Sequence, residues 1–180
     1  MRVTATDLAG VKLIEPKVFG DDRGFFMESW NARTFAAAGI DATFVQDNHS
    51  RSRRGVLRGL HYQIEHAQGK LVRCVAGEVF DVVVDLRRSS PTFGRSIGLT
   101  LSAENQRMLW VPPGFAHGFL AVSEFADFLY KTTDYWYPEH ERTLLWNDAA
   151  LAIAWPLSGV PMLAPKDAAG VPIAAAAVYD

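Results

Sequence analysis

The feature that most constrains the fold is a pair of short apolar segments in the middle of the chain, residues 71–75 and 79–86. One face of the second segment, read with a period of two, is formed by Phe80, Val82, Val84 and Leu86. Gly77 lies between the segments, where a hairpin needs a residue that tolerates a tight turn. The pattern predicts two antiparallel strands joined by a hairpin.

Further short strand candidates follow, separated by polar turns, at residues 96–101, 108–111, 117–122 and 127–133. The only good helix candidate runs from about Asn31 to Ala38, where Asn31 can cap the first turn and Gly39 can end the last. We expect loops and short strands in the rest of the N-terminal third and in the proline-rich C-terminal third. This spacing is typical of an antiparallel sandwich or barrel. No repeat, linker or charge block marks a boundary, so we expect one domain, residues 1–180.

Composition excludes several classes of protein. Hydrophobic residues make up 49% of the 180 residues and charged residues 21%, which argues against a disordered chain or a coiled coil. The net charge of -2 gives no electrostatic case for nucleic-acid binding. The single cysteine, Cys74, excludes an internal disulfide framework, and no segment has the charge and apolar pattern of a signal peptide or a membrane span. We expect a soluble, cytoplasmic protein.

The basic residues are biased toward arginine, with 13 Arg against 5 Lys. Arginine suits the bidentate binding of phosphate or carboxylate. Four arginines lie within residues 51–58 of a polar segment that runs from Gln46 to Gln63. Composition alone supports a solvated loop here as well as a binding segment. Arg58 and His61 would face opposite ways on a regular strand, so both can reach one ligand only if the backbone bends, which Gly59 permits.

Two chemistries fit the histidines His61 and His117. Imidazole is a common metal ligand, but Gln63 stands where a His-X-His pair would place a second imidazole, and an amide is a poor ligand for zinc or iron. The alternative is acid–base catalysis without a metal. A neutral histidine is a suitable base near pH 7, a carboxylate can fix its tautomer, a tyrosine can return a proton, and a cation can stabilise an oxyanion. The candidates for these roles are His61, Lys70, Tyr130 and Asp167.

Several motifs occur together and in order along most of the chain. The longest are Gly59-Leu60-His61-Tyr62-Gln63, Gln68-Gly69-Lys70-Leu71-Val72-Arg73, Pro113-Gly114-Phe115-Ala116-His117-Gly118-Phe119 and Tyr130-Lys131-Thr132-Thr133-Asp134-Tyr135-Trp136. Shorter ones are found at residues 22–26, 46–50, 138–141 and 165–167. In these motifs the chain resembles the dTDP-4-dehydrorhamnose 3,5-epimerases, with no departure at the catalytic positions.

The resemblance implies an all-β fold, a cupin-type jelly-roll β-barrel with short peripheral helices and loops, and a homodimer. It implies an isomerase that works without a metal or another cofactor. Its substrate would be dTDP-4-dehydro-6-deoxy-D-glucose, and its product dTDP-4-dehydro-L-rhamnose, an intermediate of dTDP-L-rhamnose synthesis. Both inverted carbons, C3 and C5, flank the C4 ketone, so removing either proton gives an enolate with its charge on the C4 oxygen.

The resemblance also assigns roles to individual residues. His61 matches the general base, Asp167 its carboxylate partner, Lys70 the cation near the C4 oxygen, and Tyr130 the acid on the opposite face. Trp136 matches an aromatic residue that stacks on thymine. The other positions that match substrate contacts are Arg23, Glu28, Gln46, Asp47, Asn48, Arg58, His117, Glu141 and Lys166.

Three alternatives remain open at this point. Relatives that epimerise only C3 or only C5 share most of the motifs, although Tyr130 favours the double reaction because the second protonation needs a placed acid. A silent sugar-binding cupin would be expected to lack His61, Tyr130 or Asp167, and all three are present. A metal-dependent cupin oxygenase is disfavoured by Gln63.

Overall fold

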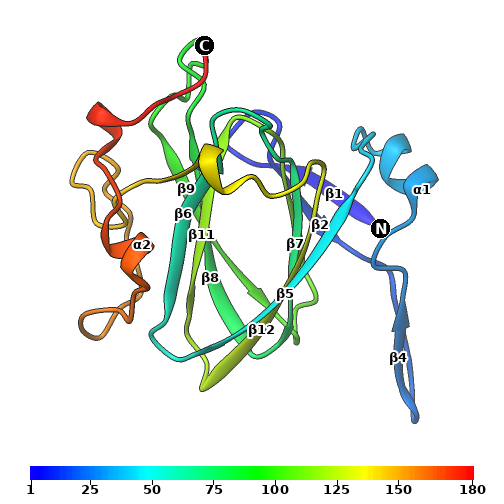
Figure 1. Ribbon diagram of the computed structural model, residues 1–180. Helices are drawn as coiled ribbons and strands as arrows, with labels where there is room; N and C mark the ends of the chain where they lie inside the picture. The colour runs from blue at the N-terminus through cyan, green and yellow to red at the C-terminus, as the bar shows by residue number, and fades with distance from the viewer.

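The computed structural model describes residues Met1 to Asp180, which fold into two antiparallel sheets that face each other (Figure 1). The six-stranded sheet has the order β1 (Arg2–Ala5), β2 (Lys12–Glu15), β10 (Met108–Val111), β7 (Lys70–Ala76), β12 (Phe125–Thr132), β5 (Gln46–Arg53). The five-stranded sheet has the order β13 (Glu141–Thr143), β6 (Leu57–Gln63), β11 (Phe115–Ala121), β8 (Glu78–Asp85), β9 (Ser96–Ser102). This is the all-β, cupin-type jelly-roll barrel that the motifs imply.

Short elements surround the barrel. The helix α1 spans Ala32–Ala37, and the Asn31 side chain caps it by accepting a hydrogen bond from the Thr34 amide. The helix α2 spans Pro165–Ala168, and two 3-10 turns cover Pro138–His140 and Ile173–Ala175. A separate hairpin, β3 (Val18–Asp21) with β4 (Gly24–Met27), projects away from the barrel. None of the helices is long and apolar enough to cross a membrane.

The strands predicted from alternation are confirmed, and Gly77 joins β7 to β8 with a positive φ of 71°. The hairpin predicted there is wrong, because β7 belongs to the six-stranded sheet and β8 to the five-stranded sheet, so the turn at Gly77 carries the chain from one sheet to the other. The arginine-rich segment from Gln46 to Gln63 is not a loop, because it forms β5 and β6. β5 is an edge strand that pairs only with β12, and residues along it alternate between partly buried and exposed for most of its length. Its polar composition therefore reflects one side facing the barrel opening and the other facing water.

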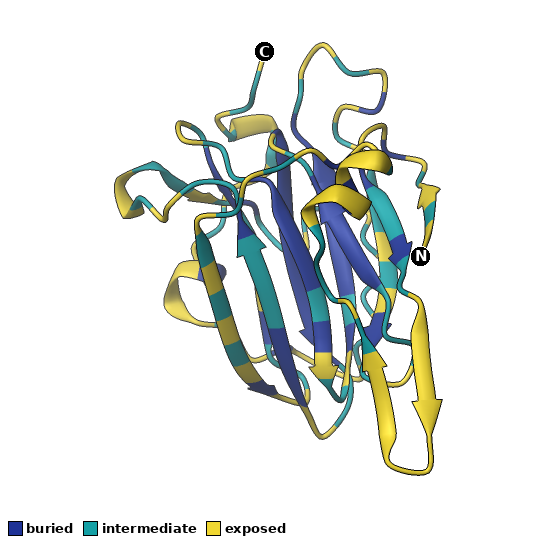
Figure 2. Ribbon diagram, turned by 90° about the vertical axis from the view of Figure 1, so that its right-hand side faces the viewer, coloured by how far each residue is buried: buried dark blue, intermediate teal, exposed yellow.

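Buried residues lie mostly on the strands of the two sheets (Figure 2), and the apolar ones form two main clusters. One cluster fills the space between the sheets and includes Val79, Val83, Phe119 and Phe128. A second lies on the outer face of the five-stranded sheet, where the C-terminal segment covers Val82, Val84 and Leu86. Apolar residues therefore lie on both faces of β8, as expected for a strand buried on both sides. The alternation predicted for residues 80–86 separates these two clusters correctly.

Two glycines allow β6 and β11 to approach closely. A Cβ on Gly118 would lie 2.5 Å from the Arg58 carbonyl oxygen, and a Cβ on Gly59 would lie 2.5 Å from the Gly118 Cα. The pairing of the two strands changes register between His117 and Phe119 at this point. The irregularity lets Arg58 and His61, three residues apart, line the same cavity, as the bend expected at Gly59 requires.

Candidate active site

A polar cavity of about 310 Å³ opens between the two sheets at one end of the barrel. Phe119 and Phe128 belong both to the apolar cluster between the sheets and to the cavity lining, so the core forms part of its wall. Eleven of the residues predicted from the sequence line this cavity: Gln46, Asn48, Arg58, His61, Lys70, His117, Tyr130, Trp136, Glu141, Lys166 and Asp167. The structure thus brings together side chains from both sheets, from α2 and from the loop after β12.

His61 and Asp167 form the tightest contact in the cavity. The His61 Nε2 lies 2.5 Å from the Asp167 Oδ1, although the two residues are 106 positions apart in the chain. The Gly59 amide donates to the same carboxylate oxygen at 3.4 Å. Burial lowers the pKa of His61, and the Asp167 hydrogen bond opposes this effect only in part. The imidazole is therefore neutral near pH 7, the form that can accept a proton.

Asp167 stays ionised despite being buried. Burial by itself would raise its pKa, but the hydrogen bond and charge of His61, together with the Gly59 amide, bring it below its usual value. Asp167 belongs to α2, a single helical turn that contacts β6. The carboxylate is thus placed to orient His61 and to stabilise the imidazolium that forms when the base takes a proton.

Lys70 and Tyr130 enter the cavity from the six-stranded sheet, opposite the sheet that carries His61. The Lys70 Nζ donates to the His61 carbonyl oxygen at 3.4 Å, which places the ammonium near the base. Burial lowers the pKa of Lys70 to about 8. Burial also raises the pKa of Tyr130, so its hydroxyl keeps its proton at neutral pH. The cavity therefore presents a base on one wall and a proton donor on the other.

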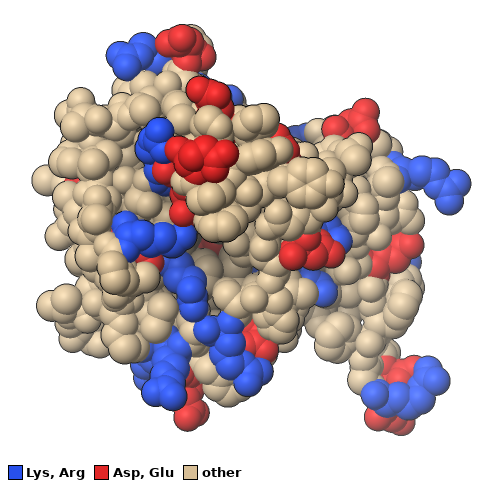
Figure 3. All heavy atoms as spheres, in the orientation of Figure 1, with Lys and Arg blue, Asp and Glu red and all other residues tan.

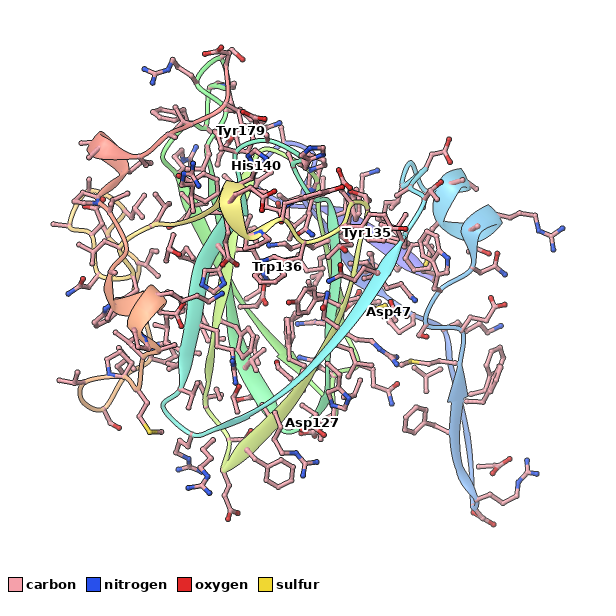
Figure 4. All side chains as sticks on the ribbon, viewed as in Figure 1. Asp47, Asp127, Tyr135, Trp136, His140 and Tyr179 are labelled. Atoms are coloured by element: carbon pink, nitrogen blue, oxygen red, sulfur yellow. The ribbon has the colours of Figure 1, made fainter.

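Charged and aromatic groups surround the opening. The Arg58 Nε donates to the Ser52 Oγ at 2.9 Å, and Lys166 pairs with Glu141 at 3.0 Å. Basic side chains gather along the middle and lower part of this face (Figure 3). Trp136 lies on the loop above the opening with 54% of its surface exposed (Figure 4). The opening can thus bind an anion and stack a planar group at the same time.

Three predicted residues do not reach this cavity within one chain. Asp47 projects from the other face of β5 and pairs with Lys131 at 2.9 Å. Glu28 accepts a hydrogen bond from the Asn31 side chain. Arg23 lies at the tip of the projecting hairpin, where it pairs with Asp21 and its side chain is 89% exposed.

Sequence reasoning missed two residues that support the site. Asp81, on β8, is buried and its Oδ2 lies 2.9 Å from the His117 Nε2. Gln63 was noted only as a poor metal ligand, but its amide group donates to the His66 and Tyr135 carbonyls and accepts from the Tyr137 amide. Gln63 therefore anchors the loop that carries Trp136. A carboxylate between the apolar residues Phe80 and Val82 was the available signal for Asp81.

No group of three or more His, Cys, Asp or Glu side chains is arranged to hold a metal ion. The polar cavity of this barrel instead holds a buried histidine–carboxylate pair, a lysine with a depressed pKa and a facing tyrosine. Fold and site together define a cupin-type barrel enzyme whose side chains are arranged for acid–base chemistry.

Comparison with known proteins identifies the family. The model for dTDP-4-dehydrorhamnose 3,5-epimerase matches residues 5–175. The enzymes of that name from Pseudomonas aeruginosa and Salmonella typhimurium are 64% and 60% identical to this chain, each match covering 94% of it and 94% and 93% of the relative. A crystal structure of dTDP-6-deoxy-D-glucose-3,5-epimerase from Legionella pneumophila with dTDP-4-keto-L-rhamnose superposes with a TM-score of 0.94 at 53% identity, covering 97% of this chain and 93% of that one. The chain belongs to the dTDP-4-dehydrorhamnose 3,5-epimerase family and is an isomerase.

The two depressed pKa values predict the pH dependence of kcat/KM. The base must be neutral, so activity is lost as pH falls through the pKa of His61, which lies below the ordinary 6.5. Lys70 must be protonated to stabilise an oxyanion, so activity is also lost as pH rises through its pKa of about 8. We expect a bell-shaped profile with its alkaline limb near pH 8. An alkaline limb near pH 10 would contradict a buried, functional Lys70.

Proposed function

We propose that this protein inverts C3 and C5 of dTDP-4-dehydro-6-deoxy-D-glucose to give dTDP-4-dehydro-L-rhamnose, in the synthesis of dTDP-L-rhamnose. The observation that carries the proposal is the His61–Asp167 pair, 2.5 Å apart, facing Lys70 and Tyr130 across the cavity. Both carbons are adjacent to the C4 ketone, so each inversion passes through an enolate with its charge on the same oxygen. One base and one oxyanion stabiliser can therefore serve both steps.

His61 removes the proton in this mechanism, and Asp167 stabilises the imidazolium that results. Lys70 stabilises the negative charge that develops on the C4 oxygen. Its ammonium is buried, where an ionic contact is stronger than it would be in water. A lysine with a pKa near 8 is protonated in most molecules at neutral pH and can supply this charge.

Inversion requires that a proton leave one face of the carbon and return to the other. His61 belongs to the five-stranded sheet and Tyr130 to the six-stranded sheet, so the sugar ring lies between them when it occupies the cavity. The raised pKa of Tyr130 keeps its hydroxyl protonated until the enolate takes the proton. After each step, exchange with solvent restores both groups.

The nucleotide half of the substrate is bound at the opening. We assign Trp136 to stacking on the thymine ring, and Arg58 and Lys166 to the diphosphate. The Gln46 side chain supports this arrangement because its Oε1 accepts a hydrogen bond from the Trp136 amide at 3.1 Å. Gln46, Asn48, His117 and Glu141 are proposed as further substrate contacts, without a metal or another cofactor.

A single-position epimerase is the main alternative within the family. It is disfavoured because the two relatives at 64% and 60% identity are both named as 3,5-epimerases, and because a placed tyrosine supplies the acid that the double reaction needs. We propose in addition that residues 1–180 act as one domain and that the reaction takes place in the cytoplasm. The one cysteine, Cys74, is buried and free, which suits a reducing compartment.

Incubation of the protein with the 4-keto sugar nucleotide in heavy water tests this function. We expect deuterium at both C3 and C5, since both protons pass through exchangeable groups. The variant His61→Asn should lower kcat by about 10²- to 10⁴-fold while leaving KM nearly unchanged, because the base acts only in the transition state. Position-resolved NMR of the product is the measurement. Label at one carbon only would indicate the single-position alternative, and label at neither would overturn the proposal.

The homodimer is proposed from the projecting hairpin of β3 and β4. Its strands pair only with each other, and an isolated two-stranded hairpin is marginal in water. Phe19, Phe25 and Phe26 are each more than half exposed on it. The ribbon of the hairpin is coloured as exposed along most of its length (Figure 2). Such a surface favours burial against another chain. We infer that the hairpin packs on a second copy and carries Arg23 toward that copy's cavity, which explains why Arg23 does not reach its own.

Analytical ultracentrifugation checks this arrangement. We expect the wild-type protein to sediment as a dimer and the variant Phe25→Ser/Phe26→Ser to sediment as a monomer, because serine removes the apolar contact. Val160→Ser is the matched control, since Val160 is 91% exposed away from the hairpin. Arg23→Ala should keep the dimer and raise KM about tenfold through the lost anion contact. A wild-type monomer at micromolar concentration would rule the arrangement out.

A further inference from the structure

A second histidine–carboxylate pair lies beside the first. The His117 Nε2 and the Asp81 Oδ2 are 2.9 Å apart, and both residues are buried. His117 is the direct β-pairing partner of His61, because β11 lies next to β6 in the sheet. Asp81 comes from β8, the neighbour of β11 on its other side. The two pairs therefore lie on one wall of the cavity, and Asp81 is the only one of the four residues without a role in the function proposed above.

Asp81 occupies a place where a carboxylate is costly. It lies on the inner face of β8, at the position between Val79 and Val83, which belong to the apolar cluster between the sheets. Its second oxygen, Oδ1, is buried without a hydrogen-bond partner. A buried carboxylate with an unpaired oxygen destabilises a fold unless nearby cations offset its charge. The fold alone gives no reason for an aspartate here.

Asp85, four residues further along the same strand, shows what a structural carboxylate looks like in this protein. It is equally buried, but its oxygens accept hydrogen bonds from Arg87, Ser90 and Thr92. These partners satisfy both of its oxygens and do not line the cavity. The contrast indicates that Asp81 is retained for its charge and not for its contribution to stability.

The charge of Asp81 acts on two cavity groups. His117 is bonded to it directly, and the Lys70 ammonium is close enough that the Asp81 charge raises the Lys70 pKa against the lowering effect of burial. The other titratable and charged groups that line the cavity around Lys70 are Glu141 on β13, Lys166 and Asp167 on α2, Arg58 and His61 on β6, His117 on β11 and Tyr130 on β12. Glu141 supports the protonated lysine and Lys166 opposes it.

We propose that Asp81 is a positioning residue for the epimerase reaction, holding the His117 ring through Nε2 and supplying the negative charge that keeps Lys70 protonated beside the enolate. The proposal rests on the function proposed above. With Nε2 donating to Asp81, the other ring nitrogen of His117, Nδ1, is left for the substrate. Asp81 itself does not line the cavity, so it acts only through these two neighbours.

The isosteric variant Asp81→Asn tests the proposal through the pH profile. Without the negative charge, the pKa of Lys70 should fall further below about 8, so the alkaline limb of kcat/KM should move down by about one pH unit. At pH 8 we expect kcat to fall about fivefold with little change in KM, because the protonated fraction of Lys70 falls by that factor. Asp85→Asn is the matched control, a buried carboxylate on the same strand, and it should lower the melting temperature without moving the alkaline limb.

These variants distinguish a failure of the proposed function from a failure of the role proposed for Asp81. If wild type and Asp85→Asn do not turn over the sugar nucleotide, the proposed function fails. If both turn it over and Asp81→Asn has the same alkaline limb as wild type, the role of Asp81 is overturned.

A measurement on the wild-type protein covers the case in which Asp81→Asn does not fold. The ¹⁵N signals of His117, assigned by their loss in His117→Gln, should show that Nε2 carries a proton, because Asp81 accepts a hydrogen bond from it. A neutral ring protonated at Nδ1 would overturn the proposal.

Discussion

The contact between His61 and Asp167 is the interaction on which the rest of the site depends. It joins β6 of one sheet to a single helical turn near the C-terminus, and it holds the pKa of Asp167 below its usual value. Burial alone would leave the imidazole neutral but without a partner for the proton it takes. The carboxylate supplies that partner, and the histidine in turn keeps the carboxylate ionised in a place where burial works against it.

The two facing sheets place other cavity residues opposite this contact, as the inversion of a carbon centre requires. A barrel that closes around an apolar core leaves one polar end, and there each sheet presents its inward side chains to the other. His61 lies on one wall, while Lys70 and Tyr130 lie on the other. The same burial that separates them from water shifts the pKa of Lys70 down and that of Tyr130 up. Burial in the cavity is therefore the main cause of the pKa shifts of both Lys70 and Tyr130.

The sequence alone predicts most of the strands but few of the contacts between residues that are far apart in the chain. Alternation located the strands from β7 to β12, and Gly77 marked the turn after β7, because these signals are local. The hairpin expected at Gly77 was wrong, because β7 and β8 belong to different sheets. β5 and β6 were ambiguous because their arginine-rich composition also suits a solvated loop. The motifs named most of the cavity lining. No spacing could join residues 106 positions apart such as His61 and Asp167, and no local signal could place Arg23 on a hairpin beyond its own cavity.

The proposed inversion requires His61 and Tyr130 to act on opposite faces of the sugar ring. The variant Tyr130→Phe, incubated with the 4-keto sugar nucleotide in heavy water, tests this claim most directly. We expect exchange without inversion. His61 still removes the protons, but no acid is present on the opposite wall, so deuterium returns from the His61 side. The substrate is therefore labelled and keeps its configuration. Inverted product formed at the wild-type rate would contradict the account.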